Sequence, residues 1–206
     1  MSDKTQNSVV LKQVLTQILE EICTLSDCQS VGFRLHNKGD YPYYVHEGFP
    51  DFFIIKENSV CARDDEGNLI LDEDGNPLLE CMCGNVLKGR FDPKFQYFTE
   101  KGSFWTNSTT RLLESTTDKE RLTRTRNMCN YSGYESVALI PIRSGNRTLG
   151  LIQINDPREN MFTLKEIENY EFIADRVGSV VVNAIEIQER MKNISDLLNK
   201  VKSNKS

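Results

Sequence analysis

The sequence predicts an α+β fold in which helices at both ends of the chain enclose two β-hairpins. Three observations lead to this prediction. Apolar residues follow helical spacing at both ends of the chain, alternate with polar residues in two inner segments, and lose any period in the long stretch between those segments. The chain has 206 residues, 38% of them hydrophobic, which suits one domain with a core of ordinary depth.

The first helix is expected to begin at Ser8, after a disordered start at residues 1–7. From Ser8 onward, apolar residues recur every three or four positions with polar residues between them, as in an amphipathic helix. The apolar positions are Leu11, Val14, Leu15, Ile18, Ile22 and Leu25.

A first β-hairpin follows this helix. Val31, Phe33 and Leu35 alternate with polar residues or glycine, residues 37–40 have the composition of a turn, and an aromatic run at residues 41–45 provides the second strand.

Residues 51–110 have no clear period and many turn residues. Two acidic turns, at residues 64–68 and 72–77, flank three aliphatic residues at 69–71, which predicts a small hairpin excursion. Irregular stretches of this length in compact domains usually serve a function.

A charged helix is expected over residues 117–128, followed by a second hairpin. Its strands are residues 136–142 and 148–155, joined by a turn at residues 144–146. Val137, Leu139 and Leu151 can face the same side of this hairpin.

The last helix begins at the capping box formed by Thr163 and Glu166. Its apolar residues repeat in a heptad-like pattern as far as Val201, and an unbroken helix of this length would span roughly 58 Å at about 1.5 Å per residue. Residues 187–206 would then extend beyond the domain. We expect this extension to form a homodimer seam together with the first helix; the other interpretation is a frayed tail at residues 195–206.

Charge and hydropathy exclude two classes of partner. The net charge is −5 with no basic excess, which argues against nucleic acid binding, and no apolar run is long enough to span a membrane. The N-terminus lacks the apolar stretch of a signal peptide, so a cytoplasmic location is expected. In that reducing compartment the six cysteines favour redox, catalytic or metal roles over structural disulfides.

Two groups of motifs resemble a known family. Residues 133–142 (GYESVALIPI) followed by 148–154 (TLGLIQI) look like the final hairpin of a GAF domain. Residues 81–86 (CMCGNV), 102–110 (GSFWTNSTT) and 124–129 (RTRNMC) resemble GAF modules of archaeal and bacterial sensor histidine kinases. This resemblance implies an antiparallel sheet with the terminal helices on one face and a ligand pocket under loops on the other.

The resemblance also implies a function. A sensor domain would occupy residues 8–186, bind a small molecule and pass a signal through its terminal helices to a partner. The phosphoacceptor and ATP-binding regions of a kinase do not follow in this sequence, so the output would need a separate histidine kinase or regulator, or a missing C-terminal part. No acid-base arrangement typical of an enzyme is evident, and we therefore expect a regulatory protein.

Four cysteines are candidate metal ligands. Cys81 and Cys83 are two residues apart, Cys61 precedes them by twenty residues, and Cys129 lies shortly before the last hairpin, near the place where GAF pockets are lined. Four converging thiolates would suit zinc or iron. A thiol redox switch and ordinary buried thiols remain open as alternatives. Cys23 and Cys28, at a helix end and in a loop, are interpreted as structural.

A second candidate site combines His46 with the polar segment Trp105, Thr106, Asn107 and Ser108. Trp105 would form a pocket wall, while the hydroxyl and amide groups would bind a small polar ligand or, equally, cap the next helix. Some sensor GAF domains carry haem, so a thiolate of Cys81, Cys83 or Cys129 with His36 or His46 would be the iron ligands. Arg124 and Arg126 would bind an anion or face solvent.

Two further functions compete with the sensor. Free methionine sulfoxide reductase is a GAF-fold thiol enzyme, and Cys129 lies twelve residues before Pro141, similar to the position of that family's nucleophile. Cys81 or Cys83 would then resolve the sulfenic acid. The string around that nucleophile is not matched, however, and no carboxyl group is placed to protonate the sulfoxide. The last alternative is an interaction adaptor whose cysteines only hold zinc.

Overall fold

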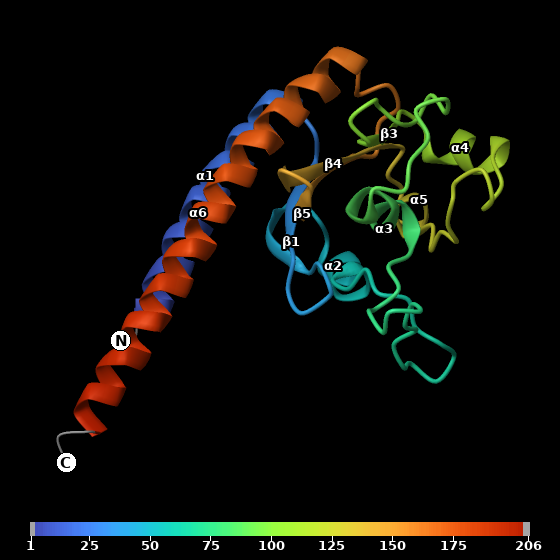
Figure 1. The fold of residues 1–206 in the computed structure, drawn as a ribbon. Helices are drawn as coiled ribbons and strands as arrows, with labels where there is room; N and C mark the ends of the chain where they lie inside the picture. Colours follow the sequence, from blue (N-terminus) through green and yellow to red (C-terminus); the bar gives the residue numbers. More distant parts are fainter. Residues whose placement is uncertain (1–2, 204–206) are drawn as a thin grey trace.

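A five-stranded antiparallel sheet separates two groups of helices, one on each of its faces (Figure 1). The structure, a computed structural model, describes residues 3–203. Strand order is β2-β1-β5-β4-β3. The strands are β1 (Ser30–Leu35), β2 (Tyr43–Glu47), β3 (Phe104–Thr106), β4 (Ser136–Ser144) and β5 (Arg147–Asp156).

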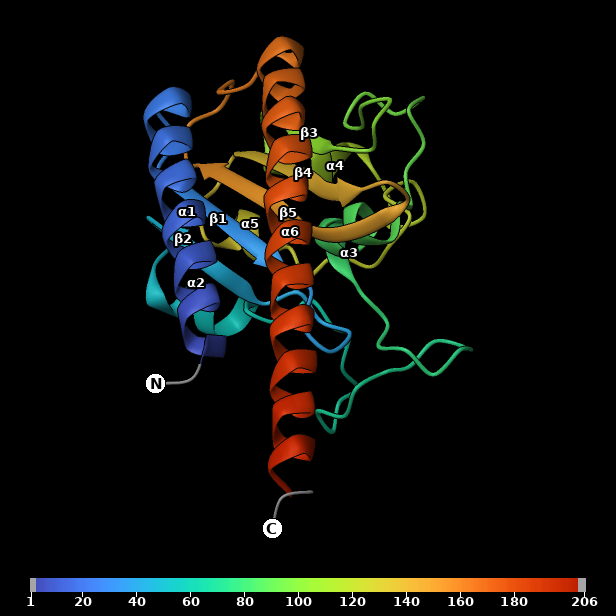
Figure 2. The same cartoon turned by 60° about the vertical axis from the view of Figure 1, so that its left-hand side comes forward.

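Within residues 3–203, six helices cover the two faces of this sheet. The terminal helices α1 (Asp3–Ser26) and α6 (Leu164–Ser203) lie side by side on one face (Figures 1 and 2). The short helices α2 (Asp51–Glu57), α3 (Cys81–Lys88), α4 (Thr109–Ser115) and α5 (Met128–Tyr131) lie on the other face. This α+β arrangement confirms the predicted fold class.

Alternation along the central strands separates two apolar cores. Ile140 of β4 is paired with Ile152 of β5, and Phe33 of β1 lies on the other side of Ile152, so these side chains pack under α1 and α6. Val137, Leu139 and Leu151 point to the opposite face, as predicted, and join the core beneath α2 to α5. Both faces of the sheet are therefore buried.

Helix α6 begins at the predicted capping box. The Glu166 N–H donates to Thr163 Oγ1 (3.3 Å), and the Thr163 N–H donates to Glu166 Oε2 (2.7 Å). The helix packs closely on β4 at Gly178, where an added Cβ would lie 2.1 Å from the carbonyl oxygen of Arg143. From Lys192 to Lys200 every side chain of α6 is exposed, and this part of the helix runs past the sheet (Figure 2).

The ends of the chain differ from the sequence prediction at one point. Helix α1 begins at Asp3, five residues before the expected start at Ser8, so residues 3–7 are helical instead of disordered. Residues 1–2 of that predicted disordered start lie outside the described residues.

None of the described helices is long and apolar enough to cross a bilayer.

The predicted irregular stretch at residues 51–110 contains three short helices and β3. Each element has eight residues or fewer, too short for a hydrophobic period to emerge. The predicted excursion is confirmed, because Arg63 bridges to Leu69 and Leu71 bridges to Pro77 in an arm that projects from the domain (Figure 2).

The predicted helix over residues 117–128 was wrong. This segment is a series of turns and extended residues, and only the four residues of α5 follow it as helix. Leu122 and Asn127 have φ angles of 62° and 57°, which no α-helix contains. Backbone carbonyls of this segment accept hydrogen bonds from distant residues instead: those of Glu120, Arg121 and Arg124 accept from Tyr97, Asn85 and Cys81.

Candidate functional site

Helices α3, α4 and α5, with the loop at residues 116–127, enclose a cavity of about 50 Å³ against β3 and β4. Its walls are mostly apolar and rich in sulfur. They are formed by Cys81, Met82, Cys83, Phe104, Leu112, Leu113, Met128, Cys129, Val137 and Leu139. A smaller set of polar residues completes the lining: Glu57, Thr109, Arg121, Thr125, Asn127 and Asn130.

Three of the four predicted cysteine ligands line this cavity. Burial raises the pKa of the Cys83 thiol to about 12. Burial also raises the pKa of Cys129 well above its usual value, and the nearby thiol of Cys83 raises it further. The pKa of Cys81 is raised by burial as well, although N–H groups of Arg126 and Met82 oppose that change. The three thiols are therefore protonated at neutral pH.

The fourth cysteine lies elsewhere. Cys61 pairs with Leu79 at the base of the arm and does not line the cavity. Within residues 3–203, no three His, Cys, Asp or Glu side chains are grouped so that they could hold a metal ion. Among these residues the predicted four-thiolate site is thus not assembled: Cys81, Cys83 and Cys129 line the cavity, and Cys61 does not.

Protonation makes a direct test of the cavity thiols possible. We expect iodoacetamide to alkylate Cys83 at least about 100-fold more slowly than free cysteine near neutral pH, because a pKa of about 12 leaves little thiolate. The alkylation rate of Cys83 should rise about tenfold per pH unit. Unfolding in urea should abolish the difference in rate between Cys83 and free cysteine. Peptide mapping after timed labelling gives the rates. Labelling of Cys83 as fast as the free amino acid would contradict the buried, protonated state.

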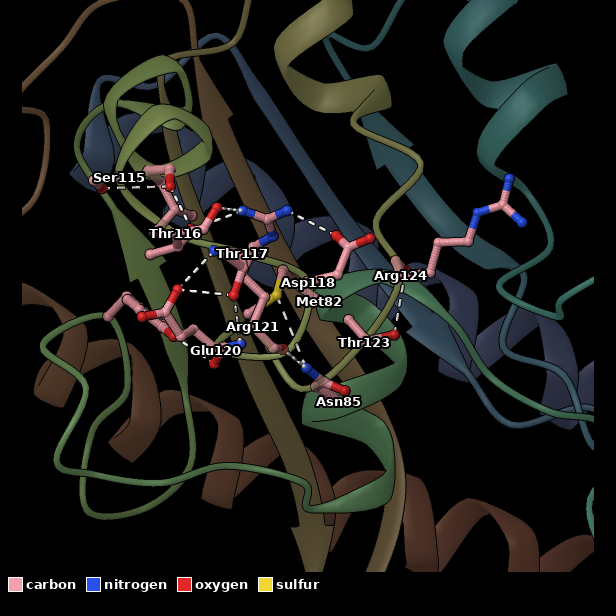
Figure 3. A network of polar contacts seen from close by, with 12 residues as sticks. Met82, Asn85, Ser115, Thr116, Thr117, Asp118, Glu120, Arg121, Thr123 and Arg124 are labelled. Carbon is pink, nitrogen blue, oxygen red and sulfur yellow. Dashed lines mark hydrogen bonds and ion pairs between the residues drawn. The ribbon is translucent and has the colours of Figure 1, made fainter.

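Arg121 forms the polar wall of the cavity and is only 6% exposed. Its Nη1 donates to the carbonyl oxygen and hydroxyl of Thr116 (2.6 and 2.7 Å), and its Nη2 donates to Asp118 Oδ1 (2.7 Å) (Figure 3). The Asn85 amide donates to the Arg121 carbonyl (2.6 Å), which ties the loop to α3. Arg121 Nε and Thr125 Oγ1 are buried and have no hydrogen-bond partner among the described residues.

The backbone around the cavity is strained. Cys81 and Asn127 line the cavity with φ angles of 63° and 57°, and Leu122, with a φ angle of 62°, follows Arg121. Each such conformation costs about 1 kcal/mol or more for a residue with a side chain. Only three other non-glycine residues of the described chain have a positive φ. Concentrated strain of this kind marks the cavity as a candidate functional site.

Arg126 is engaged by the protein itself. Its guanidinium lies 3.3 Å from the carboxylate of buried Glu57 and 3.5 Å from that of Glu80, and it donates to the carbonyl of Ser59. Burial raises the pKa of Glu57, and Arg126 opposes this change. Arg126 is therefore not available to a free anion, whereas Arg124 is exposed, as one of the two interpretations expected.

The predicted polar segment lies on the other side of α4. Trp105, Thr106, Asn107 and Ser108 line a separate, open hollow of about 410 Å³. Ser108 caps α4 by accepting a hydrogen bond from the Arg111 N–H (3.3 Å), so the capping interpretation is confirmed. The polar segment and the thiol-lined cavity are therefore two separate places.

His46 belongs to neither place. It lies exposed on β2, edge-on to Tyr43 at 5.7 Å between ring centroids, and it is not among the residues that line the cavity or the hollow. His46 and the cavity thiols are thus not brought together as haem ligands.

The sequence agrees with this architecture at the level of the family. The family model of the GAF domain matches residues 10–181. The chain belongs to the GAF family. A comparison with curated proteins finds no match.

Solved structures share the GAF fold at low sequence identity. One is a domain of a protein named as a two-component sensor histidine kinase from Sinorhizobium meliloti 1021, with 11% identity, 86% of this chain and 94% of that chain covered, and a TM-score of 0.56. The GAF domain region of a membrane protein from Geobacter sulfurreducens PCA has 15% identity, coverage of 90% and 99%, and a TM-score of 0.58. Type II free methionine-R-sulfoxide reductase from Thermoplasma acidophilum has 14% identity, coverage of 85% and 94%, and a TM-score of 0.53. These likenesses establish the fold alone.

Sequence reasoning missed the polar residues of the GAF cavity. Arg121 and Thr125 lie in a charged run that resembles a solvated helix face, and Glu57 lies in a segment without a period. One local signal was present: Thr116 and Asp118, which bind the Arg121 guanidinium, precede it by only five and three residues.

Proposed function

We propose that this GAF domain is a sensory module in which a small molecule in the cavity changes the position of β3 and, through it, of α6. The observation that carries this proposal is that residues on both flanks of β3 are hydrogen-bonded either to α6 or to the segment that leads into it. Phe104, the first residue of β3, lines the cavity, whereas Trp105 packs against the core beneath α6. This short strand therefore contacts the ligand side and the helix side of the sheet.

At one end of β3, the contact with α6 runs through Glu171. This buried carboxylate accepts hydrogen bonds from Ser103 Oγ (2.7 Å) and Thr99 Oγ1 (2.5 Å). Hydrogen bonds to a charged acceptor contribute about 1.5–3 kcal/mol each. A shift of Phe104 would pull directly on this carboxylate through Ser103.

At the other end, Asn107 contacts the residue that precedes the capping box of α6. Its Nδ2 donates to the carbonyl of Phe162 (2.7 Å), and the Phe162 N–H donates to its Oδ1 (2.9 Å). Any rotation of β3 is thereby transmitted to the start of α6. A two-state change in helix packing is a common output of such an arrangement.

The far end of α6 would deliver the signal. Ile187, Ile194 and Leu198 follow heptad spacing and are 49%, 53% and 56% exposed. We propose that they pack against α6 of a second copy and that a separate histidine kinase or regulator reads the resulting helix pair.

Xenon is a suitable probe of this coupling, because it occupies small apolar cavities without needing a hydrogen bond. We expect xenon pressure to shift the methyl NMR signals of Met82 and Met128, which line the cavity, and the amide signals around Glu171. In Glu171→Ala the methyl shifts should persist while the shifts of the α6 amides around residue 171 are lost, because only the connection through Ser103 and Thr99 is removed. The matched control is Asp175→Ala, which removes an exposed carboxylate of the same helix. Equal α6 shifts in both variants would overturn the proposed route.

The thiol-enzyme alternative is less well supported. The fold shared with the Thermoplasma reductase and the three cavity thiols favour it. A cavity of about 50 Å³, however, is too small for an amino acid such as methionine sulfoxide, and the raised pKa of Cys129 makes that thiol a poor nucleophile.

A further inference from the structure

We infer that the cavity takes a neutral molecule of about four heavy atoms with one oxygen that accepts hydrogen bonds from Arg121 and Thr125. This inference rests on the proposed function and names the ligand class of the same cavity. It follows from three properties of the cavity: its volume, the unpartnered hydrogen-bond donors in its walls and the charge balance of its lining residues.

Volume sets the size of the ligand. The cavity measures about 50 Å³. A single water molecule needs about 10–15 Å³ of such space, so about four heavy atoms fit without movement of the walls. The surrounding thiols, thioethers and aliphatic groups favour an apolar body.

Two unpartnered groups set the polar contact. The Arg121 guanidinium is fixed by Thr116 and Asp118 through Nη1 and Nη2, and Nε is its one nitrogen that is buried without a hydrogen-bond partner among the described residues (Figure 3). A guanidinium has no acceptor, and the buried hydroxyl of Thr125 can donate as well. Buried donors without partners are unfavourable, so an acceptor oxygen at this wall would be stabilised by both groups.

Charge balance makes the ligand neutral. Arg121 is already paired with Asp118 at 2.7 Å, and Glu57 is paired with Arg126 at 3.3 Å. A carboxylate ligand would bring an extra negative charge beside Glu57 with no free cation to compensate it. A ketone, amide or sulfoxide oxygen needs no counter-ion.

Methionine-methyl NMR of the full chain tests this class directly. Met82 and Met128 report on the cavity, while Met161 and Met191 are internal references outside it. We expect acetone and dimethyl sulfoxide to bind with dissociation constants of roughly 0.1–10 mM, near the limit for ligands of this size. Acetate, matched in size but charged, and dimethyl sulfide, which lacks the oxygen, should bind at least about tenfold more weakly.

A substitution at Thr125 removes the hydroxyl donor while it keeps the shape of the cavity wall. Thr125→Val keeps the side-chain shape and should weaken acetone binding about five- to tenfold, whereas Thr123→Val, outside the cavity, should leave binding unchanged. If Thr125→Val does not fold, the comparison of acetone with acetate in the unmodified chain decides.

The outcomes distinguish this inference from the proposed function. Binding of acetate as tight as that of acetone, or of dimethyl sulfide as tight as that of dimethyl sulfoxide, would overturn the ligand class and leave the sensory cavity standing. Equal binding by Thr125→Val and the unmodified chain would refute the role of the hydroxyl. If neither xenon nor any of these probes moved the signals of Met82 and Met128, both proposals would fail.

Discussion

Replacement of Arg34 by leucine is expected to lower the free energy of unfolding by about 4 kcal/mol. Arg34 is fully buried on the cavity side of β1. Its guanidinium donates to the carbonyls of Glu57 (2.6 Å), Tyr41 (3.1 Å) and Asn58 (3.2 Å) and to Gln153 Oε1 (3.2 Å). It also lies over the Tyr43 ring at 3.7 Å from the centroid.

The size of this effect follows from the acceptors that the leucine would leave behind. Three buried or half-buried carbonyls would lose their donor, at about 1–3 kcal/mol for each one that water cannot reach. The carboxylate of Glu57 would also lose a nearby positive charge, which contributes to lowering its pKa. Because Arg34 joins β1 and β5 to the end of α2, the substitution should loosen the Glu57 wall of the cavity as well.

Urea unfolding of the two variants Arg34→Leu and Arg124→Leu measures this contribution. Arg124 is exposed, so its replacement should change stability by no more than about 0.5 kcal/mol. A decrease of less than about 1 kcal/mol in the free energy of unfolding of Arg34→Leu would contradict this prediction. The buried guanidinium would then stabilise the protein no more than an apolar side chain of similar size, as has been found where some buried ion pairs are replaced by apolar residues.

Elements with a long or repeated period could be predicted from the sequence. The two terminal helices and both hairpins have enough residues for helical spacing or alternation to emerge, and the capping box at Thr163 fixed the start of α6. Helices α2, α3 and α4 have seven or eight residues, which is about two turns, and their side chains face a core built from distant segments. Tertiary packing, which a local pattern does not contain, determines these helices.

At residues 117–128, by contrast, the sequence predicts a helix that the structure does not contain. Its composition is compatible with helix, but Arg121 is buried and its carbonyl is bound by Asn85 from α3, thirty-six residues away in the chain. The N–H of Cys81 likewise donates to the carbonyl of Arg124 (3.1 Å). These long-range bonds outweigh local helix propensity, and no single-segment pattern could reveal them.

The candidate site was predictable only in part. Residue type pointed to the cysteines, and three of the four predicted ones line the cavity. The position of Cys61 depends on the fold of the arm, and the separation of Trp105 from the thiols depends on where α4 lies. Arg121 and Thr125 became candidates only when burial and missing partners were known.

The exposed half of α6 leads to the second large expected effect. We expect the chain to form a dimer through this helix and the double variant Ile194→Asp, Leu198→Asp to be monomeric. Both residues are more than half exposed in the single chain and lie on the heptad stripe. Two carboxylates placed in an apolar seam should raise the dissociation constant of the dimer at least about 100-fold.

Sedimentation equilibrium of three proteins decides this prediction: the unmodified chain, the seam variant and a charge-matched control. The control Asn193→Asp, Asn199→Asp adds the same charge on exposed positions of α6 outside the heptad stripe, so it should remain a dimer. The distal helix should also lose helical circular dichroism in the seam variant, because an isolated helical end without a packed face is only marginally stable in water. A monomeric unmodified chain, or equal dissociation of both variants, would refute the seam.

The coupling of β3 to α6 involves only residues near the start of this helix. The xenon response of the domain should therefore survive in the monomeric variant. Dimerisation would then act on the output and not on ligand binding.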